Sequence, residues 1–288
     1  MPIDGFWAAD PARPIGVFDS GIGGLSVLNA LRAELPHERF AYFADSAHAP
    51  YGERDEAHVM ARTAAIANEL VQVHGAKALV VACNTATAAA IHLLRARHPA
   101  LPIVGVEPAL KPAVAASATG HVGVLATRGT LASAKFGALC ASLAGQARFS
   151  VVPCDGLAHA IEQGDAAAVG RLAAGYVAAL GACGDQPGEI DALVLGCTHY
   201  PLIADLLRRH TGAHVRFVET GPPVAQQTRR LLDAAGQLAP AGGPAAGDVV
   251  LLCSGDHAGA LQAAAQQWLR PATGAMPDAC TAQDAVLE

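Results

Sequence analysis

The stretch Val80-Val81-Ala82-Cys83-Asn84-Thr85-Ala86-Thr87 places a cysteine where a strand ends and a helix begins. The apolar run Ala78 to Ala82 is typical of a buried strand, and the alanine-rich pattern from Ala86 to about Arg97 predicts a helix. Backbone N–H groups and the helix dipole at such a junction favour a thiolate. We therefore expect them to lower the pKa of Cys83 well below that of a free thiol. Asn84-Thr85 can cap the helix or hydrogen-bond a ligand.

A second stretch, Leu193-Val194-Leu195-Gly196-Cys197-Thr198-His199-Tyr200-Pro201, repeats this construction. An apolar run again ends in a small residue and a cysteine, and Pro201 stands where the first turn of a helix is expected. Cys83 and Cys197 are separated by about one domain length. Two cysteines at strand ends in duplicated settings are therefore the feature that the fold must explain.

The bulk composition is that of a well-packed cytoplasmic protein. The 288 residues are 52% hydrophobic and 15% charged, which is enough apolar content for a large core in one or two domains. No strongly apolar run is long enough for a membrane span, and the N-terminus lacks the apolar segment of a secretory signal. The net charge of −6 argues against direct binding of nucleic acid.

Strands alternate with helices along the chain, which predicts parallel sheets covered by helices on both faces. Asp19, Asp45, Cys83 and Glu107 each end or follow a predicted strand, and such sheets bind ligands outside the carboxyl ends of their strands. The alternation begins again at His121–Ala126. We therefore expect an α/β fold of two similar lobes, each a mainly parallel sheet flanked by helices. The active site is expected in the cleft between them.

The expected domain limits follow this alternation. Residues 1–112 plus 221–270 are expected to form the first lobe, which carries Cys83. Residues 113–220 are expected to form the second lobe, which carries Cys197. Residues 271–288 show little periodicity, which indicates a loose C-terminal tail.

The glycine-rich segment Gly21-Ile22-Gly23-Gly24-Leu25-Ser26 is close to the dinucleotide-binding pattern G-x-G-x-x-G. Asp45 then falls roughly where a ribose-binding acid is expected. However, Ser26 replaces the third small residue, and Asp19 adds a negative charge beside the pyrophosphate position. A nucleotide-binding or non-catalytic α/β module therefore remains the alternative to an enzyme with paired cysteines.

Metal and redox chemistry fit the sequence less well. Cys197-Thr198-His199 supplies two types of zinc ligand, but no Cys-x-x-Cys pair completes a tetrahedral set, so we expect no metal. Thiol oxidoreductases usually carry that same pair. The seven cysteines are odd in number and lack the spacing of a disulfide scaffold, which indicates reduced thiols.

Acid–base chemistry by paired thiols fits better. Inverting a stereocentre with a weakly acidic C–H needs a base on one face and an acid on the opposite face. Two equivalent thiols that face each other across a cleft between duplicated lobes meet this need. Asp19 and His199 are candidates to assist Cys83 and Cys197 respectively.

Five spaced motifs resemble those of the glutamate racemases, in the cofactor-independent Asp/Glu racemase superfamily. They are GVFDSGIGGLSVL, ADSAHAPYGER, VACNTATAAA, GVEPALKPA and LGCTHYPLI, between about Ile15 and Val218. The resemblance implies that Cys83 and Cys197 are the proton-exchanging residues. It also implies substrate contacts at Asp19, Ser20, Tyr51, Gly52, Asn84, Thr85, Thr198 and His199. Many relatives have arginine where this chain has His48.

The resemblance implies an isomerase that interconverts L- and D-glutamate and supplies D-glutamate for peptidoglycan. None of Lys77, Lys111 and Lys135 has the setting of a pyridoxal-phosphate lysine, so we expect no cofactor. An aspartate racemase of the same superfamily is the alternative enzyme. We expect a small-molecule partner, glutamate, no membrane or nucleic-acid partner, and leave a homodimer open.

Overall fold

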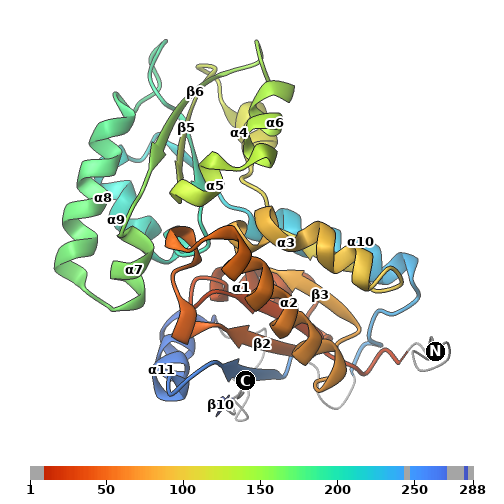
Figure 1. Cartoon of the computed structure of the whole chain (residues 1–288). Coiled ribbons are helices and arrows are strands. Elements are labelled where there is room, and N and C mark those ends of the chain that lie inside the picture. Colours follow the sequence, from red (N-terminus) through yellow and green to blue (C-terminus); the bar gives the residue numbers. More distant parts are fainter. Residues whose placement is uncertain (1–9, 243–246, 271–281, 285–288) are drawn as a thin grey trace.

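The computed structural model describes residues 10–242, 247–270 and 282–284. It has two lobes, each built around one parallel sheet that helices flank (Figure 1). This arrangement confirms the predicted α/β class and its two-lobed form. Within the described ranges, none of the helices has the length and apolar content that a membrane span requires.

The first lobe contains a six-stranded sheet in which neighbouring strands are parallel. Its strands are β1 (Ile15–Asp19), β2 (Phe40–Ala44), β3 (Ala78–Val81), β4 (Ile103–Gly105), β9 (Val249–Cys253) and β10 (Ala282–Asp284). Across the sheet the order is β10-β9-β2-β1-β3-β4. Every residue of β1, β2 and β3 is buried, as expected for strands covered on both faces.

Helices cover both faces of this sheet. They are α1 (Leu25–Glu34), α2 (Glu56–Gln72), α3 (Asn84–Arg97), α10 (Gly221–Ala234) and α11 (Ala258–Trp268), with short 3₁₀ turns η1 (Ser46–His48) and η2 (Tyr51–Glu53). Val17 and Val80 pack in one apolar cluster with α1, α10 and α11. Phe18 and Val81 pack in the other with α2 and α3. Successive side chains of each strand therefore supply the two cores alternately.

The second lobe contains a four-stranded parallel sheet of order β6-β5-β7-β8. Its strands are β5 (His121–Ala126), β6 (Arg148–Pro153), β7 (Ala192–Gly196) and β8 (Arg216–Val218). Its helices are α4 (Leu110–Ala116), α5 (Arg128–Ala132), α6 (Ala134–Ser142), α7 (Leu157–Glu162), α8 (Ala166–Leu180) and α9 (Ala204–Thr211), with the 3₁₀ turn η3 (Tyr200–Ile203). One core packs under α7, α8 and α9, and the other under α4 and α6.

The two sheets share one topology. The order β2-β1-β3-β4 in the first lobe matches β6-β5-β7-β8 in the second. In each lobe the first strand therefore lies between the second and the third. In the first lobe, α1 after the first strand covers one face, and α2 and α3 after the second and third strands cover the other. In open α/β sheets this reversal creates a crevice at the carboxyl ends of the first and third strands, which is where ligands bind.

The chain passes between the lobes twice. It first crosses from β4 to β5, and α4 on this connection packs against β5, β7 and β8. The predicted limit between residues 112 and 113 therefore falls within α4. The chain returns after β8, where α10 packs against α1 and β9 pairs with β2. The domain limits as a whole stay a prediction.

The C-terminus differs from the loose tail predicted for residues 271–288. Residues Ala282–Asp284 form β10, which pairs in parallel with β9 at the edge of the first sheet. Three residues are too short to show a periodic pattern, and the pairing depends on a strand distant in sequence. The rest of that segment, 271–281 and 285–288, lies outside the described residues.

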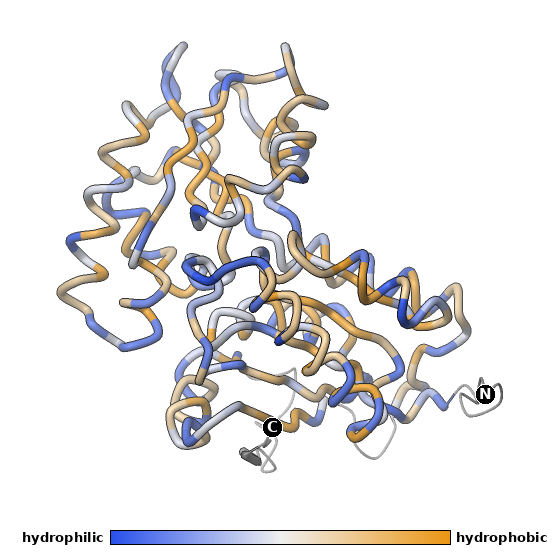
Figure 2. The backbone as a smooth tube through the Cα atoms, viewed as in Figure 1, coloured by the Kyte–Doolittle hydropathy of each residue, from blue (hydrophilic) through white to orange (hydrophobic). Residues whose placement is uncertain are grey.

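Figure 2 shows apolar strands inside both lobes, with hydrophilic residues mainly on loops and outer helix faces.

Candidate active site

Cys83 and Cys197 occupy equivalent places in the two sheets. Cys83 follows β3 and Ser20 follows β1, so both stand at the crevice of the first lobe. Cys197 follows β7 and Thr127 follows β5, at the crevice of the second lobe. The positions of both cysteines at the carboxyl ends of strands agree with the sequence prediction.

Cys83 is the N-cap of α3. Its Sγ accepts a hydrogen bond from the N–H of Ala86 at 3.5 Å, and its thiol donates to Ser20 Oγ at 3.7 Å. Burial, followed by the negative charge of Asp19, raises the pKa of Cys83 to about 12, despite the N–H groups of the helix end. The predicted lowering of this pKa is therefore wrong, because the sequence indicated the helix end but not the burial.

Asp19 is fully buried at the end of β1. Its carboxylate accepts hydrogen bonds from the N–H of Gly24 at 2.9 Å and from the hydroxyl of Thr198 at 3.3 Å. Thr198 belongs to the second lobe, so Asp19 connects the surroundings of the two cysteines. Burial raises the pKa of Asp19 above its usual value, and the nearby His199 partly offsets this rise. A raised pKa makes Asp19 a better general base.

Cys197 begins a chain of three polar side chains within the second lobe. Its Sγ lies 3.6 Å from Nδ1 of His199, and Nε2 of His199 lies 2.5 Å from Oε1 of Glu162. Burial lowers the pKa of His199, but the hydrogen bonds to Cys197 and Glu162 raise it well above its ordinary value. Both contacts favour the charged form of the imidazole, and in that form Nδ1 donates toward the sulfur and stabilises negative charge there.

The loop that carries Tyr51 and Gly52 reaches from the first lobe to the second. The Tyr51 hydroxyl donates to Asp45 at 2.5 Å, and Tyr51 is 1% exposed. A Cβ on Gly52 would lie 3.0 Å from Cβ of Thr127, so only a glycine fits this approach without a shift. The loop therefore reaches the second lobe at Gly52, and the tyrosine hydroxyl is already engaged within the protein.

Asn84 and Thr85 face the second lobe from the start of α3. Asn84 is buried, yet among the described residues neither atom of its amide has a hydrogen-bond partner. Thr85 Oγ1 lies 3.3 Å from Oγ1 of Thr127 across the cleft. A buried, unpaired amide is costly, and a polar ligand in the cleft would satisfy it.

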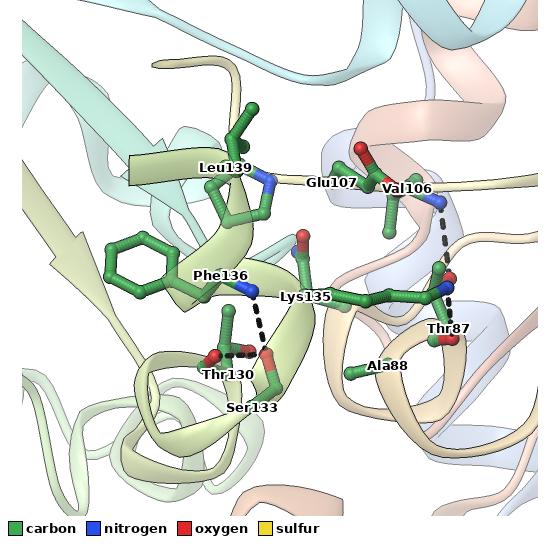
Figure 3. A pocket seen from close by; sticks show the side chains of 11 residues that line it. Thr87, Ala88, Val106, Glu107, Thr130, Ser133, Lys135, Phe136 and Leu139 are labelled. Carbon is green, nitrogen blue, oxygen red and sulfur yellow. Dashed lines mark hydrogen bonds between the residues drawn. The ribbon is translucent and has the colours of Figure 1, made fainter. Parts of the chain in front are cut away.

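A small pocket lies beside Asn84, between the two lobes (Figure 3). Thr87, Val106 and Glu107 line it from the first lobe, and Thr130, Ser133 and Lys135 line it from the second. Figure 3 shows the Lys135 side chain extending across the pocket, where Nζ donates to the carbonyl of Thr87 at 3.4 Å. Lys135 therefore bridges the lobes on this side of the cleft.

Comparison with known proteins agrees with this arrangement. A family model of Asp/Glu/hydantoin racemases matches residues 25–228. The chain belongs to this family. A glutamate racemase from Ectopseudomonas mendocina is 52% identical over 221 residues, which are 76% of this chain and 82% of that protein.

Solved structures of family members have the same fold. A glutamate racemase isoform from Bacillus anthracis superposes with a TM-score of 0.79 at 27% identity, over 96% of this chain and 99% of that one. The Escherichia coli glutamate racemase, solved with L-glutamate and the activator UDP-MurNAc-Ala, superposes with a TM-score of 0.74 at 32% identity. That match covers 89% of this chain and 95% of the other.

The glycine-rich turn of this family member does not have the geometry of a phosphate-binding loop. The N–H groups of Gly21 and Gly24 donate to Asp19, and that of Ile22 donates to Glu162 at 2.7 Å. Donors that would hold a phosphate are thus already paired with two carboxylates. A Cβ on Gly21 would lie 1.8 Å from Glu162 Oε1, and one on Gly23 would lie 2.4 Å from His199 Nδ1. These glycines allow the second lobe to approach.

Sequence reasoning did not identify Glu162 or Thr127 as parts of the site. Glu162 ends the short helix α7 and Thr127 is the N-cap of α5, and neither lies in a recognisable motif. His48 does not lie beside the two cysteines; the centre of its ring lies 5.3 Å from that of His58. Among the described residues, no group of three or more His, Cys, Asp or Glu side chains is arranged to hold a metal ion.

Proposed function

We propose that the protein is a glutamate racemase that inverts the α-carbon of glutamate by proton transfer between two thiols, without a cofactor. The observation that carries this proposal is the pair of buried cysteines, one at the crevice of each lobe, each with its own acid–base neighbour. The 52% identity to a glutamate racemase and the L-glutamate bound in the E. coli structure support glutamate as the substrate.

One sulfur removes the α-proton, and the other returns a proton to the opposite face of the carbon. The C–H bond breaks as one S–H bond forms, and the second S–H bond breaks as the new C–H bond forms. With a pKa of about 12, Cys83 holds its proton and is suited to donate it. Cys197, whose sulfur lies 3.6 Å from Nδ1 of His199, is proposed to act as the base in this direction.

In the reverse direction the two sulfurs exchange roles. Cys83 must then lose its proton, and the buried carboxylate of Asp19, with its raised pKa, is proposed to accept it. Cys197 must gain a proton, and His199 is proposed to supply it. Glu162 keeps His199 charged between turnovers.

The substrate carries two carboxylates and an ammonium group, so its site needs both donors and acceptors. The proposed substrate contacts are Asp19, Ser20, Tyr51, Gly52, Asn84, Thr85, Thr198 and His199. The unpaired amide of Asn84 supports this choice, because bound substrate would satisfy it. The engaged hydroxyl of Tyr51 indicates that Tyr51 and Gly52 contribute their backbone N–H groups instead.

The cellular role proposed for this activity is the supply of D-glutamate for peptidoglycan in the cytoplasm.

The proposed mechanism needs no pyridoxal phosphate. Lys77 pairs with Glu38 at 2.6 Å and is therefore not free to form a Schiff base. A homodimer, and the lack of nucleic-acid and membrane partners, stay predictions.

Circular dichroism of L- and D-glutamate during incubation with the purified protein tests this function. We expect racemisation of glutamate from either enantiomer, much slower racemisation of aspartate, and no binding of NAD. Dialysis against EDTA should leave the rate undiminished. Faster racemisation of aspartate would make the protein an aspartate racemase, and activity restored only by metal or pyridoxal phosphate would exclude the cofactor-independent mechanism.

A further inference from the structure

The loop from Ser46 to Glu53, here named the substrate loop, is anchored at its base by a buried carboxylate. Asp45, which follows β2 at its base, is fully buried. Its carboxylate accepts two hydrogen bonds from the guanidinium of Arg62 on α2, at 2.7 and 3.0 Å. It also accepts the hydrogen bond from the Tyr51 hydroxyl. Arg62 thus connects the rigid helix α2 to the substrate loop through one carboxylate.

This anchor determines what the substrate loop presents to the cleft. The Tyr51 ring is buried against Phe18, with ring centres 6.1 Å apart, and its hydroxyl points to Asp45. Tyr51 and Gly52 begin the 3₁₀ turn η2, whose first N–H groups have no carbonyl partner within the turn, and in the described part of the chain no carbonyl outside the helices and strands accepts from them. Gly52 lies against Thr127 of the second lobe. The loop therefore brings the N–H groups at the start of η2 close to the second lobe, and such groups suit a carboxylate.

The bidentate pair with Arg62 is what allows Asp45 to remain charged inside the protein. Burial alone would raise the pKa of Asp45, but hydrogen bonds from Arg62, Ser254 and Tyr51 lower it overall. Without the guanidinium, a buried carboxylate would be left unpaired and would take up a proton or water. Either change would weaken the hydrogen bond from Tyr51 and release the loop.

We propose that Arg62 is a positioning residue that holds, through Asp45 and Tyr51, the backbone N–H groups at which Tyr51-Gly52 bind a carboxylate of the amino-acid substrate. This inference rests on the proposed function. Arg62 does not touch the reacting atoms. It therefore acts on substrate binding more than on the proton transfers.

The second lobe provides a matched control. Arg128 pairs with Asp155, which follows β6 as Asp45 follows β2. This pair is exposed, with 65% of the Arg128 side chain and 49% of the Asp155 side chain accessible. Exposed ion pairs are weak because water screens them. The chain thus has two arginine–aspartate ion pairs after equivalent strands, one buried at the substrate loop and one on the surface.

The test compares Arg62→Met, Arg62→Lys, Tyr51→Phe and Arg128→Met, with kcat and KM measured from both enantiomers of glutamate. A variant that weakens the binding of substrate and transition state equally has a higher KM and an unchanged kcat. We therefore expect Arg62→Met to raise KM about tenfold or more. Arg62→Lys should give a smaller rise, because lysine keeps the charge but not the bidentate geometry. Tyr51→Phe should also raise KM, and Arg128→Met should match the wild type.

Thermal unfolding of each variant separates positioning from stability. The proposal would be overturned if Arg62→Met and Tyr51→Phe left KM unchanged. It would also be overturned if these variants lowered only kcat or the unfolding temperature. If Arg62→Met does not fold, Arg62→Lys and Tyr51→Phe decide it by the same criterion. Wild-type protein that does not racemise glutamate would instead refute the proposed function, which keeps the two failures distinct.

Discussion

Glu162 Oε1 lies 2.7 Å from the backbone nitrogen of Ile22, although the two residues belong to different lobes. The same oxygen lies 2.5 Å from Nε2 of His199. One carboxylate therefore closes the cleft and orients the imidazole beside Cys197. Any opening that admits substrate between these lobes must break the bond to Ile22, while the bond to His199 can persist because both partners belong to the second lobe.

Glu162→Gln should reduce kcat by up to about 100-fold, the lower end of the range that general acid–base catalysis contributes. The amide keeps the shape of the carboxylate but removes the charge that holds the pKa of His199 high. The pH profile of kcat should therefore move so that His199 loses its proton at lower pH. Asp185→Asn removes an exposed carboxylate and should change neither quantity. An unchanged kcat and pH profile in Glu162→Gln would contradict the role given to this carboxylate.

His199 also makes stability depend on pH. Its pKa in the folded protein is raised above the ordinary value of 6.5. Its contribution to the free energy of unfolding is therefore fully present below pH 6.5 and is lost as the pH rises through the folded value. His199→Asn should be less stable than the wild type at low pH, and the difference should shrink as the pH rises. Urea unfolding at a series of pH values measures this, and a difference that grows with pH would refute it.

Gly21→Ala should abolish most activity because the second lobe leaves no room for a methyl group. The added Cβ would lie 1.8 Å from Glu162 Oε1, so the carboxylate must move away from Ile22 and His199. Gly137→Ala in α6 meets nothing within 4 Å and should stabilise the protein by about 0.5–1 kcal/mol without changing kcat. Racemisation assays and thermal unfolding of both variants check this. Full activity in Gly21→Ala would show that the close approach of the lobes is not required.

The sequence predicted the elements of the fold well because its signals were local. Apolar runs such as Ala78–Val81 and the polar residues after them identify buried parallel strands, and the repeated alternation identifies two lobes. The short strand β10 was missed, because its pairing with β9 depends on distant residues. The predicted start of α3 at Ala86 was two residues late, since Cys83 itself is the N-cap.

Contacts between the lobes were the part of the site that the sequence could not supply. Glu162 is brought to Ile22 and His199 only by the packing of one lobe on the other. The pKa of Cys83 was predicted in the wrong direction for the same reason. The helix end is a local feature, whereas burial and the charge of Asp19 depend on the whole fold.

The cysteines should differ sharply in their importance for racemisation. Cys83→Ser and Cys197→Ser should each lose several orders of magnitude in rate, since a serine hydroxyl is a far weaker acid than a thiol and does not supply the ionised form that removes the proton. Cys140→Ser and Cys183→Ser should keep their activity, because both residues lie only partly buried and away from the cleft. Comparable losses in all four variants, accompanied by lower unfolding temperatures, would mean that the assay measures stability and not chemistry.

Transfer of solvent hydrogen tests the two-thiol mechanism itself. If Cys83 and Cys197 act on opposite faces of the α-carbon, the proton that is removed stays on one sulfur. The proton that is delivered comes from the other, which has already exchanged with water. In D₂O, early product from either enantiomer should therefore carry deuterium at the α-carbon, while unreacted substrate stays mostly protiated.

A single base that moved between the two faces would carry the original proton across, and the early product would keep its hydrogen. A hydride route through a bound nicotinamide would return the original hydrogen as well. Mass spectrometry of product and remaining substrate at low conversion distinguishes these cases in both directions of the reaction. Two sulfurs fixed in separate lobes cannot exchange places, so an early product with largely unexchanged hydrogen would rule out the roles assigned to Cys83 and Cys197.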